Sequence, residues 1–338
     1  MTMRTAALLV CALVSFTALK AQDPNFSQFF ASPLTLNPAL TGKFEGVVRA
    51  AGNYRNQWPS INNAFTTYTA SVDLGILKRN IPEFDQFGVG VLAFSDKSGN
   101  GVLQNNSVAL STAYHKSLDE NGFNQIGLGF QGAFVTKFLD VTKVKFLDQL
   151  TSVGFTGVTS EIFDQGSLNL SYFDLNVGAL YNGTSNGSNN YYVGASMYHI
   201  TRPKESFNGG NYVLDPRLTI QAGGRLPVGE FNAVHFSAIH SRQSNALNTV
   251  IGGAYMINAN QDPQAPTNLY FGTWFRLGDA VIPYIGLEFG SFHIGATYDV
   301  NTSSLKPGSN MRGGAEFSLI YIRKPADPYA KDVKCPKF

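Results

Sequence analysis

Charged side chains are scarce in this sequence. Asp, Glu, Lys and Arg together make up 14% of the 338 residues, compared with about 25% in an average soluble domain. The formal net charge is +2, from 25 basic and 23 acidic residues. Removal of an N-terminal signal containing Arg4 and Lys20 would leave 23 residues of each sign. The chain therefore lacks the excess of positive charge that is typical of nucleic-acid binding, and we expect no nucleic-acid partner.

Cysteines and long apolar runs are also rare. Residues 1–21 contain Arg4, the apolar run from Ala6 to Leu19 and a small residue at Ala21, an order typical of a cleaved secretory signal peptide. No other stretch approaches about 18 consecutive apolar residues, so no transmembrane helix is expected. The two cysteines are Cys11, in the apolar core of the signal, and Cys335. The mature chain would keep only one of them and could form no internal disulfide.

The usual motifs of enzymes and metal sites are missing. The sequence contains no Gly-Xaa-Ser-Xaa-Gly elbow, phosphate-binding loop or dinucleotide fingerprint. His235 and His240, which are five positions apart in one expected strand, would point to opposite faces. The histidines are spread over separate segments without the spacing of ligands, at His115, His199, His235, His240 and His293. We therefore expect no catalytic centre, no metal and no cofactor.

Aromatic residues and glycine, in contrast, are abundant. Phe, Trp and Tyr make up 13% of the chain, and glycine occurs 34 times. The mean hydropathy is nevertheless only −0.06, so apolar side chains must be interleaved with Ser, Thr, Asn, Gln and Gly. A sheet with one lipid-facing side and one wet side requires such a composition.

Most of the chain after residue 43 repeats segments of about ten residues in which apolar and polar side chains alternate. Phe173, Leu175 and Val177 alternate with Asp174 and Asn176, and a period of two predicts strands with unlike faces. About 14 strands are expected, near 44–57, 62–76, 86–94, 105–115, 125–138, 171–182, 190–200, 217–227, 231–240, 248–257, 269–277, 280–288, 291–300 and 314–322.

The polar faces of these expected strands carry acidic residues and glycines. Asp174, Asp299 and Glu316 are interpreted as lumen-facing groups in hydrogen-bonded networks. In residues 87–91 and 126–131, glycines occupy one face and apolar side chains the other.

The pattern predicts one all-β domain, a transmembrane antiparallel β-barrel over residues 44–322 in the outer membrane. A soluble β-sandwich also alternates, but its outer face would carry more charge than the Phe, Tyr, Leu and Val faces found here. If the first strand runs outward, the long connections 139–170, 201–216 and 301–313 lie outside the cell. Several connections at the opposite end are short, as in bacterial outer-membrane barrels.

Within the segment of residues 22–43, Gln28 to Gly42 show neither helical nor strand periodicity. They end in Asn37-Pro38-Ala39-Leu40-Thr41-Gly42, where a fixed proline between Asn and Gly predicts a compact turn. A barrel of 14 strands has a lumen wide enough to need filling if it is not a pore. We expect this segment to plug the barrel, to bind a partner, or both.

The last expected strand is followed by a basic tail, residues 323–338, which contains Lys331, Lys334 and Lys337. The same parity places the tail in the periplasm. Two interpretations stay open: a contact with periplasmic partners, or a chain end without a role.

Four stretches carry a resemblance to a known family: Asp23 to Phe30, Pro33 to Gly42, Tyr54 to Pro59 and Cys335 to Phe338. With them the chain resembles the PorP/SprF family of outer-membrane proteins of the type IX secretion system of Bacteroidetes. The Asn37-Pro38-Ala39 turn is also similar to one in the N-terminal hatch of FadL-type barrels, which transport hydrophobic molecules.

The resemblance implies a non-enzymatic, gliding-associated or secretion-associated component that helps exported proteins cross the outer membrane or stay attached outside. The implied partners are type IX components on the periplasmic side, outer-membrane lipid, and a secreted adhesin or other cargo with a C-terminal sorting domain. Whether the protein is core machinery or serves one adhesin stays open. The candidate plug or partner-binding residues are Gln28, Asn37, Pro38, Ala39, Gly42, Tyr54, Arg55, Gln57, Trp58, Cys335 and Phe338.

Two other functions are compatible with a barrel. A FadL-like transporter of small hydrophobic molecules predicts an apolar pocket in the lumen and a lateral opening in a strand. A general porin predicts an open channel. The polar residues Gln131, Asp174, Asn176 and Thr297 favour a polar lumen over that of a hydrophobic transporter, and the expected N-terminal plug opposes an open channel.

Overall fold

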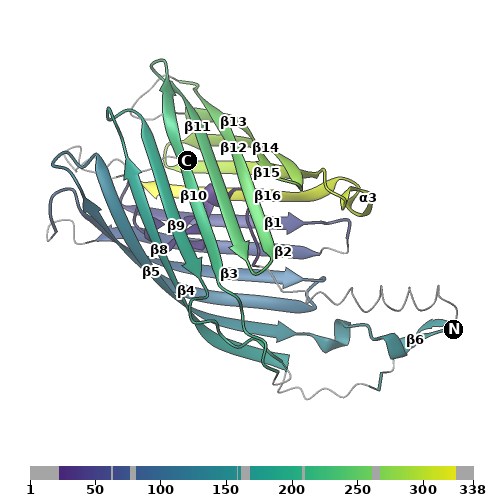
Figure 1. Cartoon of the computed structure of the whole chain (residues 1–338). Helices are drawn as coiled ribbons and strands as arrows, with labels where there is room; N and C mark the ends of the chain where they lie inside the picture. Colours follow the sequence, from purple (N-terminus) through teal and green to yellow (C-terminus); the bar gives the residue numbers. More distant parts are fainter. Residues whose placement is uncertain are drawn as a thin grey trace, which may run out of the picture.

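The computed structural model describes residues 23–61, 64–76, 81–157, 159–160, 168–207, 210–260 and 267–324. Fourteen antiparallel strands form a closed barrel in which β1 pairs with both β2 and β16 (Figure 1). The barrel strands are β1 (Val48–Gln57), β2 (Phe65–Ile76), β3 (Gln86–Ser98), β4 (Leu103–Ser117), β5 (Asn124–Leu139), β8 (Asn169–Gly183), β9 (Asn190–Tyr198), β10 (Arg217–Val228), β11 (Asn232–Gln243), β12 (Ala246–Asn258), β13 (Thr267–Arg276), β14 (Ala280–Phe289), β15 (Phe292–Asn301) and β16 (Arg312–Arg323).

All fourteen strands expected from the alternation are present, and the closed barrel confirms the predicted fold class. The first strand begins at Val48 rather than at residue 44, and β3, β4 and β5 extend further than predicted. The long connection after β5 also contains a small sheet of β6 (Leu150–Thr151) and β7 (Gly154–Phe155). The sequence predicted only a loop there, because strands of two residues are too short to show a period.

The wall of the barrel has an apolar outer face and a polar inner face. Outward side chains such as Leu110, Phe130 and Phe173 are more than half exposed, whereas the inward Asp174 and Glu316 are buried. This division rules out a soluble β-sandwich and fits a barrel surrounded by lipid. No helix in the described residues is long and apolar enough to cross a membrane.

The barrel wall has one irregular place. Ile282 and Pro283 of β14 have no partners in the register with β15, although the pairs on both sides are formed. Proline lacks the N–H that a ladder needs. On its other edge, β15 shifts register against β16 between Asp299 and Val300. Both defects lie at the same height of one strand.

The two ends of the barrel differ. The connections 140–168, 199–216 and 302–311 lie at one end, here called the loop end, and the opposite end is called the turn end. The sequence predicts that the loop end lies outside the cell.

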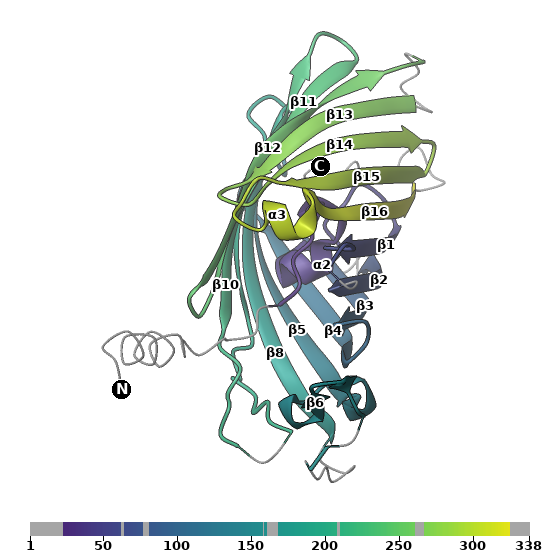
Figure 2. The ribbon, with the colours of Figure 1, turned by 90° about the vertical axis from the view of Figure 1, so that its right-hand side faces the viewer.

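The N-terminal segment, residues 23–43, lies inside the barrel, where α2 (Pro33–Leu36) is surrounded by the wall (Figure 2). It also forms the short 3-10 helices η1 (Phe29–Ala31) and η2 (Pro38–Leu40). The segment passes from contacts near the loop end, made by Asp23, to contacts near the turn end, made by Lys43. The chain then enters β1 at the turn end.

Candidate functional site

The N-terminal segment is attached to the barrel wall at several places between the loop end and the turn end. The attachment made by Ser27 and Gln28 is a buried ionic cluster near the loop end. The backbone amides of Ser27 and Gln28 each donate a 2.8 Å hydrogen bond to the carboxylate of Glu316. The Ser27 hydroxyl donates to Asp299 at 2.7 Å. Because β15 and β16 hold both acceptors, the start of the segment is fixed to the last two strands of the chain.

Two arginines balance these carboxylates. Arg55 of β1 contacts Asp299 at 2.9 Å and Glu316 at 3.1 Å, and Arg276 of β13 contacts Asp299 at 2.9 Å. Both guanidinium groups also donate to the Ser27 hydroxyl. Buried charges are stable only when they are paired and hydrogen-bonded. Removal of one member would therefore leave the others uncompensated.

The Gln28 side chain joins the segment to β16 and β15. Its amide nitrogen donates to the Glu316 carbonyl oxygen at 3.1 Å, and its carbonyl oxygen accepts from Ser318 at 2.7 Å. A Cβ at Gly295 would lie 2.4 Å from the same Gln28 oxygen. The wall thus provides both the partners and the space for this side chain.

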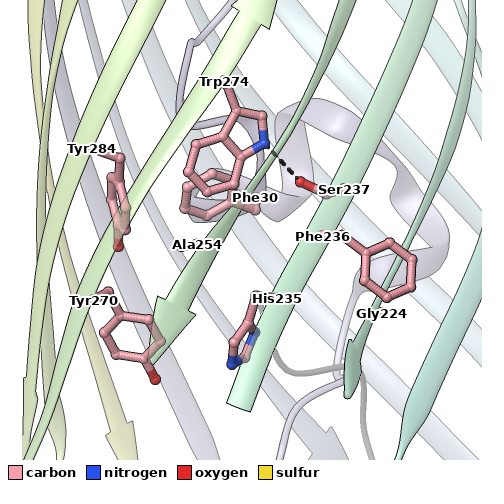
Figure 3. A pocket seen from close by; sticks show the side chains of 9 residues that line it. All are labelled: Phe30, Gly224, His235, Phe236, Ser237, Ala254, Tyr270, Trp274 and Tyr284. Atoms are coloured by element: carbon pink, nitrogen blue, oxygen red, sulfur yellow. Dashed lines mark hydrogen bonds between the residues drawn. The ribbon is translucent and has the colours of Figure 1, made fainter. Parts of the chain in front are cut away.

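An aromatic cluster lies below the ionic cluster, between η1 and the wall. The Phe30 ring lies 4.9 Å from Trp274 and 5.5 Å from Tyr284, centroid to centroid. Figure 3 shows these rings around a small pocket, with Trp274 donating to Ser237 at 3.0 Å. Tyr270 lines the same pocket. The segment is therefore held here by packing of rings rather than by charge.

The Asn37 turn forms a third attachment. The Asn37 side chain accepts a hydrogen bond from Ala39 N at 2.8 Å and donates to the carbonyl oxygens of Ala179 and Ala195 at 3.0 and 3.2 Å. It closes η2 and bridges β8 and β9 at once. Asn37, Ala39 and their neighbour Pro38 thus form a compact turn against the wall.

Glycines of the wall make room for this turn. A Cβ on Gly178 would lie 1.8 Å from the Asn37 side-chain oxygen, and one on Gly129 would lie 2.3 Å from Ala39 N. A Cβ on Gly88 would lie 2.3 Å from the Thr41 carbonyl oxygen. These are distances at which real atoms cannot coexist, so the turn fits only against a wall that lacks side chains there.

The lowest attachment is at the turn end, where the segment joins β1. Gly42, with a φ of +71°, donates its amide hydrogen to Asp73 at 2.8 Å. Asp73 also forms an ion pair with Arg49 at 2.7 Å, and Arg49 donates to the Leu40 carbonyl oxygen at 3.0 Å. Lys43 donates to Gln125. The positive φ explains the glycine, because other residues adopt it only with strain.

A separate charged chain holds the first described residue at the loop end. The Asp23 carboxylate contacts His199 at 2.7 Å and Arg217 at 3.3 Å, and the other His199 nitrogen contacts Asp174 at 2.8 Å. Burial alone would lower the pKa of His199, but the carboxylates of Asp23 and Asp174 outweigh it and raise the pKa to about 9. Burial alone would raise the pKa of Asp23, but His199 and Arg217 hold it well below its usual range.

The structure brings some of the sequence-predicted residues together and separates others. Gln28, Asn37, Pro38, Ala39 and Gly42 all contact the barrel wall from inside, and Arg55 joins their upper attachment. The other predicted residues of this stretch, Tyr54, Gln57 and Trp58, take no part in the attachments described above.

Tyr54 instead packs against Tyr68, with ring centroids 5.1 Å apart, and Trp58 packs against Phe65 at 5.7 Å. Gln57 is half-buried at the end of β1. Cys335, Phe338 and the tail 325–338 lie outside the described residues, as does the expected signal peptide, residues 1–21.

Several site residues are not singled out by the sequence, among them Asp23, Ser27, His199 and Arg276. His199 lies 176 positions from Asp23, and Glu316 lies 289 positions from Ser27, so no local pattern marks these pairs. Asp174, Asp299 and Glu316 were placed in lumen-facing networks, and they do form such networks. His235 is buried and His240 is exposed, as the strand period predicted. Among the described residues, no group of three or more His, Cys, Asp or Glu side chains could hold a metal ion.

The PorP/SprF profile, described as type IX secretion system membrane protein PorP/SprF, matches residues 18–321. The chain belongs to this family. Its place in the family and its closed barrel locate the protein in the outer membrane. A search of the curated proteins found no match.

Several solved barrels are similar to this PorP/SprF protein in fold. The toluene transporter TbuX of Ralstonia pickettii is 9% identical, with a TM-score of 0.48 over 87% of this chain and 94% of its own. A FadL homologue of Pseudomonas aeruginosa is 8% identical, with a TM-score of 0.45 over 84% and 92%. CdiB of Acinetobacter baumannii is 8% identical, with a TM-score of 0.43; the match covers 82% of this chain and 60% of CdiB. Such distant likenesses carry no argument about binding.

Proposed function

We propose that this protein is a non-enzymatic scaffold of the type IX secretion system. Residues 23–43 close the lumen as a plug, the loop end holds an exported protein such as an adhesin, and the turn end contacts type IX components in the periplasm. The main observation in support is that hydrogen bonds attach the N-terminal segment to seven strands of the wall: β1, β2, β5, β8, β9, β15 and β16.

The nature of these attachments favours a permanent plug over a movable gate. A cargo chain passing through the lumen would have to break the Glu316, Asn37 and Asp73 contacts together. Each buried group left without a partner costs about 1–3 kcal/mol. The glycine-lined fit of the Asn37 turn would be lost as well. We therefore propose that exported proteins bind to the barrel and do not pass through its lumen.

The test is affinity purification of the tagged protein from detergent-solubilised outer membranes, followed by mass spectrometry. Recovery of type IX components, or of one large exported adhesin, would support the scaffold and distinguish core machinery from a dedicated adhesin partner. An untagged barrel of the same membrane serves as the control. Reproducible recovery of small hydrophobic molecules alone would replace the scaffold with a transporter.

The tail offers a second test of the periplasmic contact. We propose that residues 325–338, with Lys331, Lys334 and Lys337, bind a periplasmic component. Deletion of Lys331 to Phe338 should then reduce recovery of periplasmic type IX components and leave recovery of outer partners unchanged. Unchanged recovery of both would remove the tail from the proposal.

A FadL-like transporter of small hydrophobic molecules remains the second candidate, because two observations favour it. The pocket beside Phe30 is lined by aromatic rings, and the β14–β15 ladder is interrupted at Ile282 and Pro283. Against it stands the polar inner face, where Asn176 donates to Gln131 and Gln131 donates to the Leu34 carbonyl oxygen. Ligand extraction from the purified barrel, in the same preparation, separates the two functions.

A further inference from the structure

Strand β8 is much longer than the strand beside it. It has 15 residues, whereas β9 has 9. On its β5 side, β8 is paired from Gly183 to Asn169, which is opposite Phe138. On its β9 side, the ladder covers only Val177 to Gly183. The barrel rim therefore has a step at this point of the loop end.

The last hydrogen bond on the β9 side is donated by Ile200 N to the Leu175 carbonyl oxygen, at 3.1 Å. In an antiparallel strand, the N–H and C=O of one residue point to the same side, and the side alternates from residue to residue. The main-chain groups of Phe173, Ser171 and Asn169 therefore point the same way as those of Leu175. Among the described residues, no hydrogen bond reaches these three residues from that side.

The open edge lies where a polar row interrupts the apolar outer face. Phe134 and Phe173 are paired, and both are more than half exposed on the outer face. The next outward pair is Thr136 and Ser171, which is polar. The polar row continues across the neighbouring strands, because Thr136 is opposite Asn106 and Ser95 donates to Asn106 at 2.7 Å. The edge therefore crosses this polar row at Ser171, and the outward Phe138, which is opposite Asn169, is again apolar.

The inner side of the same stretch is held firmly. The Tyr172 hydroxyl donates to Glu205 at 2.9 Å, and Lys137 also contacts Glu205. Asp174 accepts from Thr201 at 3.2 Å and contacts His199. A strand held in its extended form before binding loses little entropy when a partner joins it.

Natural edge strands are usually blocked by proline, by exposed lysine or by a covering segment. Residues 169–174 read Asn-Leu-Ser-Tyr-Phe-Asp. They contain no proline and no lysine, and their one charged side chain, Asp174, is buried. Nothing in this stretch opposes pairing with another chain.

We propose that the β9-facing edge of β8, at Asn169, Ser171 and Phe173, is a strand-addition site for an extended segment of an exported protein. This inference rests on the scaffold function and specifies how the loop end holds its partner. The added strand would form main-chain hydrogen bonds with these three residues, and its side chains would meet Phe173 and Ser171 on the outer face.

A second copy of this chain does not fit the edge. Two copies in one membrane are related by an axis along the membrane normal, so their β8 strands would run in the same axial direction. Barrel strands are tilted by about 35–45° to that axis, and two of them would cross at roughly 70–90°, which precludes a ladder. The occupant must be free to align with β8, as a segment of an exported protein is.

The direct test places a photo-reactive amino acid at Ser171 of the full-length protein in living cells. Ser95 is the matched control, because it lies in the same row on the outer face three strands away. We expect Ser171 to cross-link to one short segment of an exported protein, identified by mass spectrometry, and Ser95 to give at least about tenfold less of that product. Cross-links from Ser171 only to lipid, to its own chain or to a second copy would overturn the proposal, as would none at all.

A substitution provides an independent readout. In Ser171→Pro the lost N–H faces the open side, so the β5 ladder keeps its bonds, and Ser171→Thr is the control. We expect Ser171→Pro to lower recovery of the exported partner by about tenfold or more, equivalent to roughly 1.4 kcal/mol, and Ser171→Thr to leave it unchanged. Equal recovery with a folded Ser171→Pro barrel would refute the edge. Recovery of periplasmic type IX components with Ser171→Pro shows whether the scaffold function itself still holds.

Discussion

Gln28 and Glu316 are joined by two hydrogen bonds, although they lie 288 positions apart. The Gln28 amide donates to the Glu316 carboxylate at 2.8 Å, and the Gln28 side chain donates to the Glu316 carbonyl oxygen at 3.1 Å. The N-terminal segment is thereby tied to β16. Closure of the barrel between β1 and β16 and seating of the N-terminal segment therefore depend on the same residues.

The first prediction concerns this link. Glu316→Ala removes the acceptor of two backbone amides and a charge paired with Arg55. Loss of a partner in a buried, charged network costs about 3–5 kcal/mol. We expect a clear fall in the temperature at which the fast-migrating folded form disappears on gels. Glu230→Gln, at an exposed position between β10 and β11, should leave this temperature unchanged. An unaltered Glu316→Ala barrel would show that the link is dispensable.

The second prediction concerns the glycine-lined fit. Gly178→Ala would bring a Cβ to 1.8 Å from the Asn37 side-chain oxygen and should displace the turn, so that added protease cleaves within residues 23–43. Gly52→Ala is the matched control, because its Cβ would have no atom closer than 3.9 Å. Equal resistance of both variants to cleavage would mean that the turn tolerates a side chain in the wall.

A third prediction separates the donor from the acceptor of Asn37. Asn37→Asp keeps the oxygen that accepts from Ala39 but places a second oxygen against the carbonyl oxygens of Ala179 and Ala195. Asn37→Ala only removes hydrogen bonds, at about 1–3 kcal/mol for each buried group left unpaired. We expect the Asp variant to be the less stable of the two at neutral pH. The reverse order would mean that repulsion between these oxygens is relieved by a change of conformation.

The fourth prediction is a pH dependence at the loop end. The pKa of His199 is raised to about 9 by Asp23 and Asp174, compared with about 6.5 for an unperturbed histidine. Protonation therefore stabilises the folded state fully below about pH 6.5, and this stabilisation is lost as the pH rises through about 9. Melting temperatures of the purified barrel should fall between pH 7 and 10, and His199→Gln should flatten this change. An equal fall in His199→Gln would assign it to other groups.

The strands could be predicted from the sequence because they depend on local alternation alone. Leu175, Asn176 and Val177 show the period within three residues, and closure in sequence order needs no further information. The contacts of the N-terminal segment could not be predicted in the same way. Ser27 meets Arg276 only because the ten barrel strands between them, β1 to β5 and β8 to β12, bring β13 around to the same side of the lumen.

Two glycines of the wall show what the alternation alone does not predict. The alternation predicts that Gly88 and Gly129 lie on the polar faces of their strands. Their role is a close approach of main chain, because Thr41 and Ala39 occupy the space that side chains would fill. The resemblance singles out Arg55 together with its neighbours, but among Tyr54, Arg55 and Gln57 the hydrogen bond to the segment described here is that of Arg55 to Ser27.

The most direct test of the closed-lumen scaffold is the conductance of the purified protein in planar lipid bilayers, compared with a variant that lacks residues 23–43. A plugged barrel predicts no steady ion current for the full-length protein and open-channel steps for the deletion variant. A steady, full-length current as large as that of the deletion variant would contradict the plug, and with it the claim that this barrel binds its partners without conducting.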